Sequence, residues 1–262
     1  MTSVTRGNGQ LFYEKYGNGP ECLLAFHGFG QDGKVFEQWP KWLNSKYTIY
    51  AFDLFYHGRS HRVHDNLSKH EWQAWIDTFL LQERIERFSV LGYSLGGRFA
   101  ISAAVLFEQR INRLILVAPD GIYLTTWFKL ATTPGIRRLF KHIMTHPNRM
   151  ERLLAFNDRT KIINSYIADF AKKEMGDLDN RKRIYWSWNF FKTLGYSEKQ
   201  LIQHFSKVIY DRRLILGKKD HIIPSRSILP IIKKMGVFQL DLLPLKHHQL
   251  VKSEIAELLL NE

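Results

Sequence analysis

Short apolar runs alternate with longer amphipathic stretches over residues 1–120. Residues 21–27 and 88–92 have the length and the continuous apolar character of buried strands. Residues 68–84 instead carry tryptophan, isoleucine and phenylalanine at the spacing of one helix face. Buried strands separated by amphipathic helices are typical of a parallel sheet, because each crossover between parallel strands needs a long connection. The pattern predicts an α/β fold with a mostly parallel central sheet flanked by helices.

The pattern changes over residues 121–207, where helical periodicity dominates and no buried-strand run appears. Strand and helix patterns then resume, with strands expected at 213–217 and 237–243 and a closing helix at 251–260. We therefore expect a core formed by residues 1–120 and 208–262, with residues 121–207 as a helical insertion. Aromatic residues gather in the insertion and suggest an apolar pocket or simply the insertion's own core: Trp127, Phe128, Trp186, Trp188, Phe190 and Phe191.

The charge of the chain is strongly positive, with 38 Lys and Arg against 25 Asp and Glu and a net charge of +13. Residues 121–200 hold 15 of the basic and 7 of the acidic residues, dispersed along helical patterns such as Arg181-Lys182-Arg183. A dispersed surplus without a recognised module argues against nucleic-acid binding. It predicts solvated basic helix faces, which could also attract an anionic substrate or lipid surface.

The cellular location follows from cysteine use and hydropathy. The single cysteine, Cys22, lies in an apolar run; it excludes an internal disulfide and fits a reducing compartment. Residues 1–20 are polar and lack the layout of a signal peptide. No apolar run approaches the ~18 residues that a membrane-spanning helix needs. We expect a cytoplasmic protein without stable membrane insertion, whose oligomeric state the sequence leaves open.

The first candidate catalytic motif is a G-x-S-x-G element between an expected strand and an expected helix, Gly92-Tyr93-Ser94-Leu95-Gly96. In that context the serine occupies a sharp strained turn, and the flanking glycines let strand and helix approach without a Cβ clash. The serine hydroxyl is then presented at the carboxyl edge of the sheet, beside a helix N-terminus that favours negative charge. Ser94 is the candidate nucleophile.

A serine nucleophile needs a base and an acid that orients the base. Residues 213–224 form a strand followed by Gly-Lys-Lys-Asp and, four residues later, a proline. This segment, with the element around Ser94, resembles the α/β-hydrolase superfamily. The resemblance extends from about residue 11 to residue 260 and implies an α/β-hydrolase fold with a helical cap inserted after the sixth strand. It also implies that Asp220 is the triad acid, with Asp120 as the competing position.

The resemblance places the base in residues 240–248. That segment aligns without a gap to the family's strand followed by Pro-x-x-Gly-His, which assigns the base to His248 and puts His247 where the family usually has glycine. A side chain at that site could crowd the turn, or the register could slip by one and make His247 the base. We prefer His248 on the ungapped match.

The oxyanion donors also follow from the resemblance. His27-Gly28-Phe29-Gly30 ends an expected strand and is similar to the family's His-Gly-x loop. The backbone N–H groups of Phe29 and Leu95 would then hold the developing negative charge. His57 matches a structural turn of the family, and we expect it to be a hydrogen-bonded structural residue.

The function implied is a serine hydrolase without metal or cofactor that acts on a small-molecule substrate. We favour hydrolysis of a small apolar or aryl carboxylic ester through an acyl-enzyme on Ser94. Arg98, on the helix after the nucleophile, and the basic insertion favour a carboxylate-bearing substrate. The alternatives are a hydrolase that cleaves carbon–carbon bonds of vinylogous diketones from ring cleavage, and a non-catalytic member that binds a ligand beneath the cap.

Overall fold

The computed structural model describes residues 2–62, 67–123, 133–146, 148–160, 172 and 176–260. Of the aromatic residues expected in the insertion, Trp127 and Phe128 lie outside these ranges. The strands are β1 (Thr2–Arg6), β2 (Gly9–Tyr16), β3 (Glu21–Phe26), β4 (Tyr47–Phe52), β5 (Phe88–Tyr93), β6 (Ile111–Val117), β7 (Asp211–Gly217) and β8 (Gln239–Leu243).

Helices connect the strands. The α-helices are α1 (Pro40–Leu43), α2 (Lys69–Gln82), α3 (Gly96–Leu106), α5 (Pro134–Thr145), α6 (Arg149–Thr160), α8 (Leu178–Phe191), α9 (Glu198–Phe205) and α10 (Ser225–Ile232). The 3₁₀ helices are η1 (Gly33–Phe36), η2 (Glu108–Arg110), η3 (Lys192–Leu194), η4 (His247–Gln249) and η5 (Ser253–Leu260).

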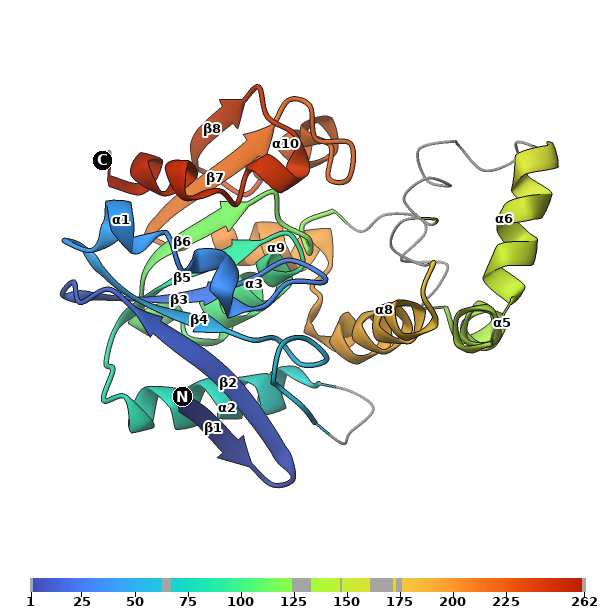
Figure 1. The fold of residues 1–262 in the computed structure, drawn as a ribbon. Coiled ribbons are helices and arrows are strands. Elements are labelled where there is room, and N and C mark those ends of the chain that lie inside the picture. The colour runs from blue at the N-terminus through green and yellow to red at the C-terminus, as the bar shows by residue number, and fades with distance from the viewer. Residues whose placement is uncertain are drawn as a thin grey trace. The chain divides into compact units, whose positions relative to one another are not determined.

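All eight strands form one twisted sheet in the order β1-β2-β4-β3-β5-β6-β7-β8 (Figure 1). The first two strands pair antiparallel with each other, and β2 pairs antiparallel with β4. From β4 to β8 all neighbours are parallel. The expected α/β fold with a mostly parallel sheet is confirmed.

Alternate side chains of the sheet enter two different apolar layers. Leu23 and Ala25 of β3 belong to a buried cluster that also contains Trp39 beside α1 and Ala256 of η5. Phe26, the next residue along β3, contacts aromatic rings of α2 and α3 on the other face. Because successive strand residues point to opposite faces, helices cover both sides of the sheet. This leaves the carboxyl edge of the parallel strands to carry functional loops.

Two segments differ from the expectations. β1 is not expected from the sequence, since it is a polar edge strand with only Val4 buried. Between β3 and β4 the chain forms the two short helices η1 and α1, and the second begins at Pro40, whose ring suits a first helical position. The closing helix is the 3₁₀ helix η5.

The chain divides into two compact units, residues 1–123 with 194–262 and residues 124–193. The inserted unit is shorter than the expected 121–207, because α9 belongs to the first unit. The ring of Phe205, at the end of α9, contacts the ring of Phe238. The backbone carbonyl of Phe205 accepts a hydrogen bond from Arg212 of β7. Within the described residues, no helix has the length and apolar character needed to span a membrane.

The inserted unit contains α5, α6 and α8. Trp188 of α8 stacks on Phe140 of α5 with ring centroids 5.7 Å apart, and Phe190 and Phe191 are fully buried. These aromatic residues therefore pack as core. Arg181 of α8 corrects another expectation: it is only 2% exposed, although the run Arg181-Lys182-Arg183 suggested a solvated face.

Candidate active site

Four loops at the carboxyl ends of parallel strands carry the expected site residues. Ser94 follows β5, Asp220 follows β7, His247 follows β8, and Phe29 lies in the loop after β3. Carboxyl ends of parallel strands meet at one edge, where α/β proteins place their ligands. The fold therefore gathers residues that lie up to 218 positions apart in the sequence.

Ser94 lies in a strained turn between β5 and α3. Its φ is 49°, in the left-handed region that residues other than glycine rarely adopt. Three bonds hold the turn: Ser94 N donates to Val117 O at 3.0 Å, and Ser94 O accepts from Gly97 N at 2.9 Å and from Asp120 N at 2.8 Å. A Cβ on Gly96 would collide with the backbone carbonyl of Phe26. The glycine thus allows the turn to pack directly on β3, as the G-x-S-x-G element predicts.

Ser94, His247 and Asp220 form one hydrogen-bonded chain. His247 Nε2 lies 2.9 Å from Ser94 Oγ, and His247 Nδ1 lies 2.6 Å from Asp220 Oδ2. An ionised carboxylate only accepts hydrogen bonds, so Nδ1 carries the proton and Nε2 is free to accept the serine hydroxyl. The Asp220 side chain is fully buried and that of His247 is 11% exposed. This arrangement can draw the hydroxyl proton from Ser94 onto an oriented imidazole.

Asp220 is itself held in place by the loop that follows it. Its Oδ1 accepts hydrogen bonds from the backbone N–H groups of Ile222, at 2.8 Å, and Ile223, at 2.9 Å. These bonds leave Oδ2 directed at His247. The Gly-Lys-Lys-Asp segment after β7 thus brings the expected acid into contact with a histidine.

The preference for His248 is corrected by this geometry. His248 is exposed, whereas its neighbour His247 is buried between Ser94 and Asp220. The chain enters the 3₁₀ helix η4 directly at His247, whose carbonyl accepts a hydrogen bond from the buried Tyr93 hydroxyl at 3.1 Å. The Tyr93 and His247 rings also pack with centroids 5.2 Å apart. The loop after β8 is therefore one residue shorter than the ungapped match implied.

Asp120 and Arg98 form a separate ion pair. Arg98 Nη2 lies 2.8 and 3.0 Å from the two carboxylate oxygens of Asp120, and Arg98 is only 2% exposed. The competing acid is thus engaged by an arginine rather than by the histidine. The same pair neutralises Arg98, so the expectation that Arg98 attracts a substrate carboxylate loses its support. The pair instead ties α3 to the loop that holds Ser94 O.

Replacing the two aspartates separately distinguishes their roles. We expect Asp220→Asn to lower kcat for a p-nitrophenyl ester by about 10⁴-fold, because an amide at this position favours the wrong imidazole tautomer. Asp120→Asn should leave kcat within a few-fold, measured at a temperature where both variants are folded. A larger loss in the Asp120 variant than in the Asp220 variant would contradict this assignment.

The loop after β3 contains Phe29, one of the two residues whose backbone N–H is expected to hold an oxyanion. Gly28 N donates to Gln31 Oε1 at 2.9 Å, and Gln31 N donates to Gly28 O at 3.4 Å, which closes a tight turn around Phe29. Within the described part of the chain, neither the Phe29 nor the Leu95 backbone N–H donates to a protein acceptor. Leu95 lies at the N-cap of α3, next to Ser94. Both N–H groups are thus available to a ligand atom.

His27 braces this loop from within the core. It is fully buried; its Nδ1 donates to Gly28 O at 2.6 Å and its Nε2 accepts from Leu54 N at 2.9 Å. Burial lowers the pKa of His27 from 6.5 to about 4, so that the ring stays neutral at physiological pH. A neutral ring is what the Leu54 bond requires, because a protonated Nε2 could not accept it.

The low pKa of His27 predicts acid sensitivity. Below pH 6.5 His27 becomes protonated in the unfolded chain, whereas in the folded protein it stays neutral until the pH falls to about 4. The free energy of unfolding should therefore decrease by about 3 kcal/mol over this interval. Denaturant titrations at several pH values measure the slope. His27→Gln should flatten it and His248→Ala, at an exposed position, should not; an equal slope in all three proteins would refute the assignment.

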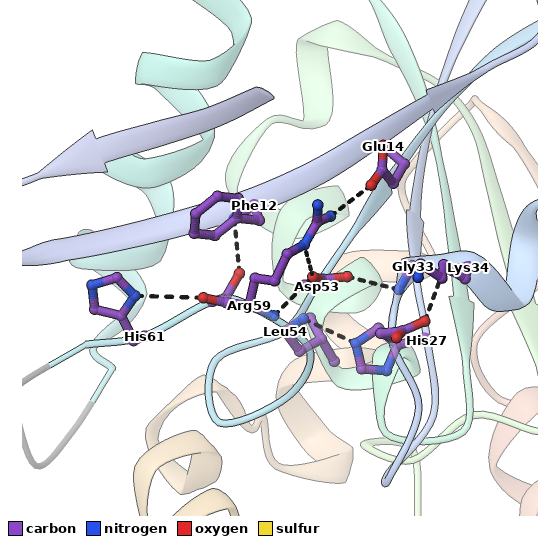
Figure 2. A network of polar contacts seen from close by, with 11 residues as sticks. Phe12, Glu14, His27, Gly33, Lys34, Asp53, Leu54, Arg59 and His61 are labelled. Atoms are coloured by element: carbon purple, nitrogen blue, oxygen red, sulfur yellow. Dashed lines mark hydrogen bonds and ion pairs between the residues drawn. The ribbon is translucent and has the colours of Figure 1, made fainter. Parts of the chain in front are cut away.

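A second polar network fixes the neighbouring loop (Figure 2). Asp53, at the end of β4, accepts hydrogen bonds from Gly33 N, Arg59 N and Arg59 Nε at 2.9, 3.0 and 3.2 Å. Arg59 also pairs with Glu14 at 2.8 Å. His57, in the same turn, is buried and packs edge-on against Phe29 with centroids 5.2 Å apart. His57 thus supports the Phe29 loop by packing, in keeping with the structural role expected for it.

An α/β fold with a hydrogen-bonded serine, histidine and aspartate at the carboxyl edge of its sheet is the arrangement that serine hydrolases of this architecture use. A model of the alpha/beta hydrolase fold family matches residues 22–235. The chain belongs to the alpha/beta hydrolase fold family.

The most informative relatives are hydrolases. A protein of Mycoplasma pneumoniae named as an esterase/lipase is 24% identical over 216 residues, which cover 81% of this chain and 76% of that protein. Further curated relatives match over only 29% to 40% of their own lengths.

Solved structures share the fold along nearly the whole chain. An esterase from Thermogutta terrifontis has a TM-score of 0.72 at 14% identity and covers 99% of this chain and 97% of its own. A meta-cleavage product hydrolase from Pseudomonas fluorescens has a TM-score of 0.65 at 18% identity and covers 99% and 96%. At such identities the similarity shows the fold alone. Because an esterase and a meta-cleavage product hydrolase share this fold, the fold does not determine which bond is cleaved.

Proposed function

We propose that the protein is a serine hydrolase that cleaves a small apolar or aryl carboxylic ester through an acyl-enzyme on Ser94. The observation that carries the proposal is the continuous hydrogen-bonded chain from Ser94 Oγ through His247 to Asp220. No metal or cofactor has a part in this mechanism. The esterase/lipase name of the Mycoplasma pneumoniae relative supports the choice of bond.

Acylation begins when His247 Nε2 takes the hydroxyl proton as Ser94 Oγ attacks the ester carbonyl carbon. The carbonyl oxygen becomes an oxyanion that the Phe29 and Leu95 N–H groups stabilise. Removing one such donor typically costs about 3 kcal/mol of transition-state stabilisation. His247 then gives the proton to the leaving alkoxide, the carbon–oxygen bond breaks, and the alcohol departs. Ser94 is left carrying the acyl group.

Deacylation repeats the cycle with water. His247 Nε2 removes a proton from water as its oxygen attacks the acyl carbon, and the same two N–H groups hold the second oxyanion. Collapse breaks the bond to Ser94 Oγ, which recovers its proton from His247, and the carboxylic acid leaves. Asp220 stays ionised throughout and stabilises the imidazolium that forms at both stages.

The substrate class is tested with p-nitrophenyl esters from acetate to decanoate, together with a vinylogous diketone of the ring-cleavage type. We expect saturable ester turnover with a maximum of kcat/KM at one chain length and little cleavage of the diketone. The reverse preference would replace ester hydrolysis by carbon–carbon hydrolysis. Folded protein that binds these compounds without turning over either class would instead indicate a ligand-binding member of the family.

A further inference from the structure

Arg181 is a buried cation in the inserted unit. It lies in the second turn of α8, and 2% of its surface is exposed. Ile184 and Tyr185, about one helical turn further on, are 2% and 5% exposed, so the arginine shares an apolar and buried helix face. The neighbouring Lys182 behaves as an ordinary surface cation, half-exposed and 3.5 Å from Asp179.

The guanidinium of Arg181 has no protein partner in the described part of the chain. Its Nε and Nη1 are buried and donate no hydrogen bond, and none of the described carboxylates lies within ion-pair distance of it. These two nitrogens belong to different edges of the planar group, so neither edge is satisfied. Two buried arginines of the first unit differ, since Arg98 of α3 pairs with Asp120 and Arg213 of β7 pairs with Asp241.

A buried and uncompensated guanidinium is strongly unfavourable. Arginine cannot escape the cost by losing its proton, because its pKa is too high. Buried charges are therefore found paired with a counter-charge or bound to a ligand. The Ser187 hydroxyl, six residues further along α8, is also fully buried and has no hydrogen-bond partner among the described residues. The unsatisfied guanidinium of Arg181 therefore indicates a binding site rather than a folding device.

The charge of the inserted unit favours an anionic ligand. Residues 124–193 contain 14 Lys and Arg against 6 Asp and Glu. One guanidinium neutralises one negative charge, so a monoanionic carboxylate would leave the buried site neutral, whereas a phosphate dianion would leave one charge uncompensated. Guanidinium and carboxylate also match in planar, two-pronged geometry.

We propose that Arg181 is the anchor of a carboxylate-binding site in the inserted unit. The ligand is the carboxylate of a small organic acid.

The first test is thermal stability in buffer without carboxylate. Arg181→Met keeps the length and apolar stem of the side chain and removes the charge, so its Tm should equal or exceed that of the wild type. A clear fall in Tm, or failure to fold, would show that the guanidinium is paired within the chain and would overturn the proposal. Lys182→Met, which removes a charge from the same helix at its surface, is the matched control and should leave Tm nearly unchanged.

The second test is binding, with sodium butyrate as probe and sodium chloride or phosphate at equal ionic strength as references. Butyrate should raise the Tm of the wild type and of Lys182→Met, and should not change that of Arg181→Met. Arg181→Lys keeps the charge but loses the planar fork, and its dissociation constant for butyrate should rise by about tenfold or more. Equal responses of wild type and Arg181→Met would refute the site.

Discussion

Ser94→Ala is expected to lower kcat for p-nitrophenyl esters by about 10⁶-fold, to the level that oxyanion binding alone sustains. The loss follows from covalent catalysis, because without Oγ no acyl-enzyme forms. Single-turnover and steady-state release of p-nitrophenolate measure the effect. A fluorophosphonate probe should label the wild-type protein on the peptide that contains Ser94 and should not label the variant.

Two further variants separate chemistry from folding in this experiment. Ser89→Ala removes a buried serine of β5, the strand before Ser94, whose Oγ has no hydrogen-bond partner among the described residues, and it should retain full kcat. Ser94→Gly should be as inactive as Ser94→Ala but more stable, because a φ of 49° strains alanine and not glycine. Turnover that survives in folded Ser94→Ala would exclude the acyl-enzyme.

His247→Ala is expected to cost about as much as the loss of Ser94, on the order of 10⁶-fold in kcat, because nucleophile and base act as one unit. His248→Ala should stay within a few-fold of wild type, since that side chain is exposed and no contact of it with Ser94 or Asp220 occurs in the structure. The two variants differ by one position in the chain and so form a matched pair.

Covalent labelling gives this pair a second readout. The fluorophosphonate probe should react with Ser94 in the wild type and in His248→Ala, and far more slowly in His247→Ala, where no base draws the proton from Ser94 Oγ. Complete loss of activity in His248→Ala with retention in His247→Ala would restore the assignment that the ungapped sequence match favoured.

The nucleophile turn was predictable because its causes are local. The apolar run before Ser94 specifies a buried strand, and the glycines at 92 and 96 remove the Cβ atoms that would prevent strand and helix from approaching. Asp220 was predictable for a similar reason, since its position relative to the end of β7 is encoded in the seven consecutive residues of the strand and the three that follow it.

The histidine that contacts Ser94 could not be chosen in the same way. His247 and His248 are chemically identical neighbours, and the family pattern prefers the second. The decision comes from distant residues: Tyr93 on β5 binds the His247 carbonyl, and Asp220 after β7 binds its ring. The end of the insertion also depends on distant contacts. Helix α9 has the helical pattern of the insertion, but its Phe205 contacts Arg212 of β7 and Phe238 next to β8.

The sequence by itself determined the α/β class, the strained serine turn, the aspartate turn after β7 and the helical character of the middle segment, because each depends on periodicity or on a few adjacent residues. Only the tertiary structure decided which histidine meets Ser94, that Asp120 is engaged by Arg98, and that Arg181 is buried while Lys182 is not. These outcomes depend on which surfaces are brought together. A side chain's environment is set by residues far away in the sequence, and no local pattern records them.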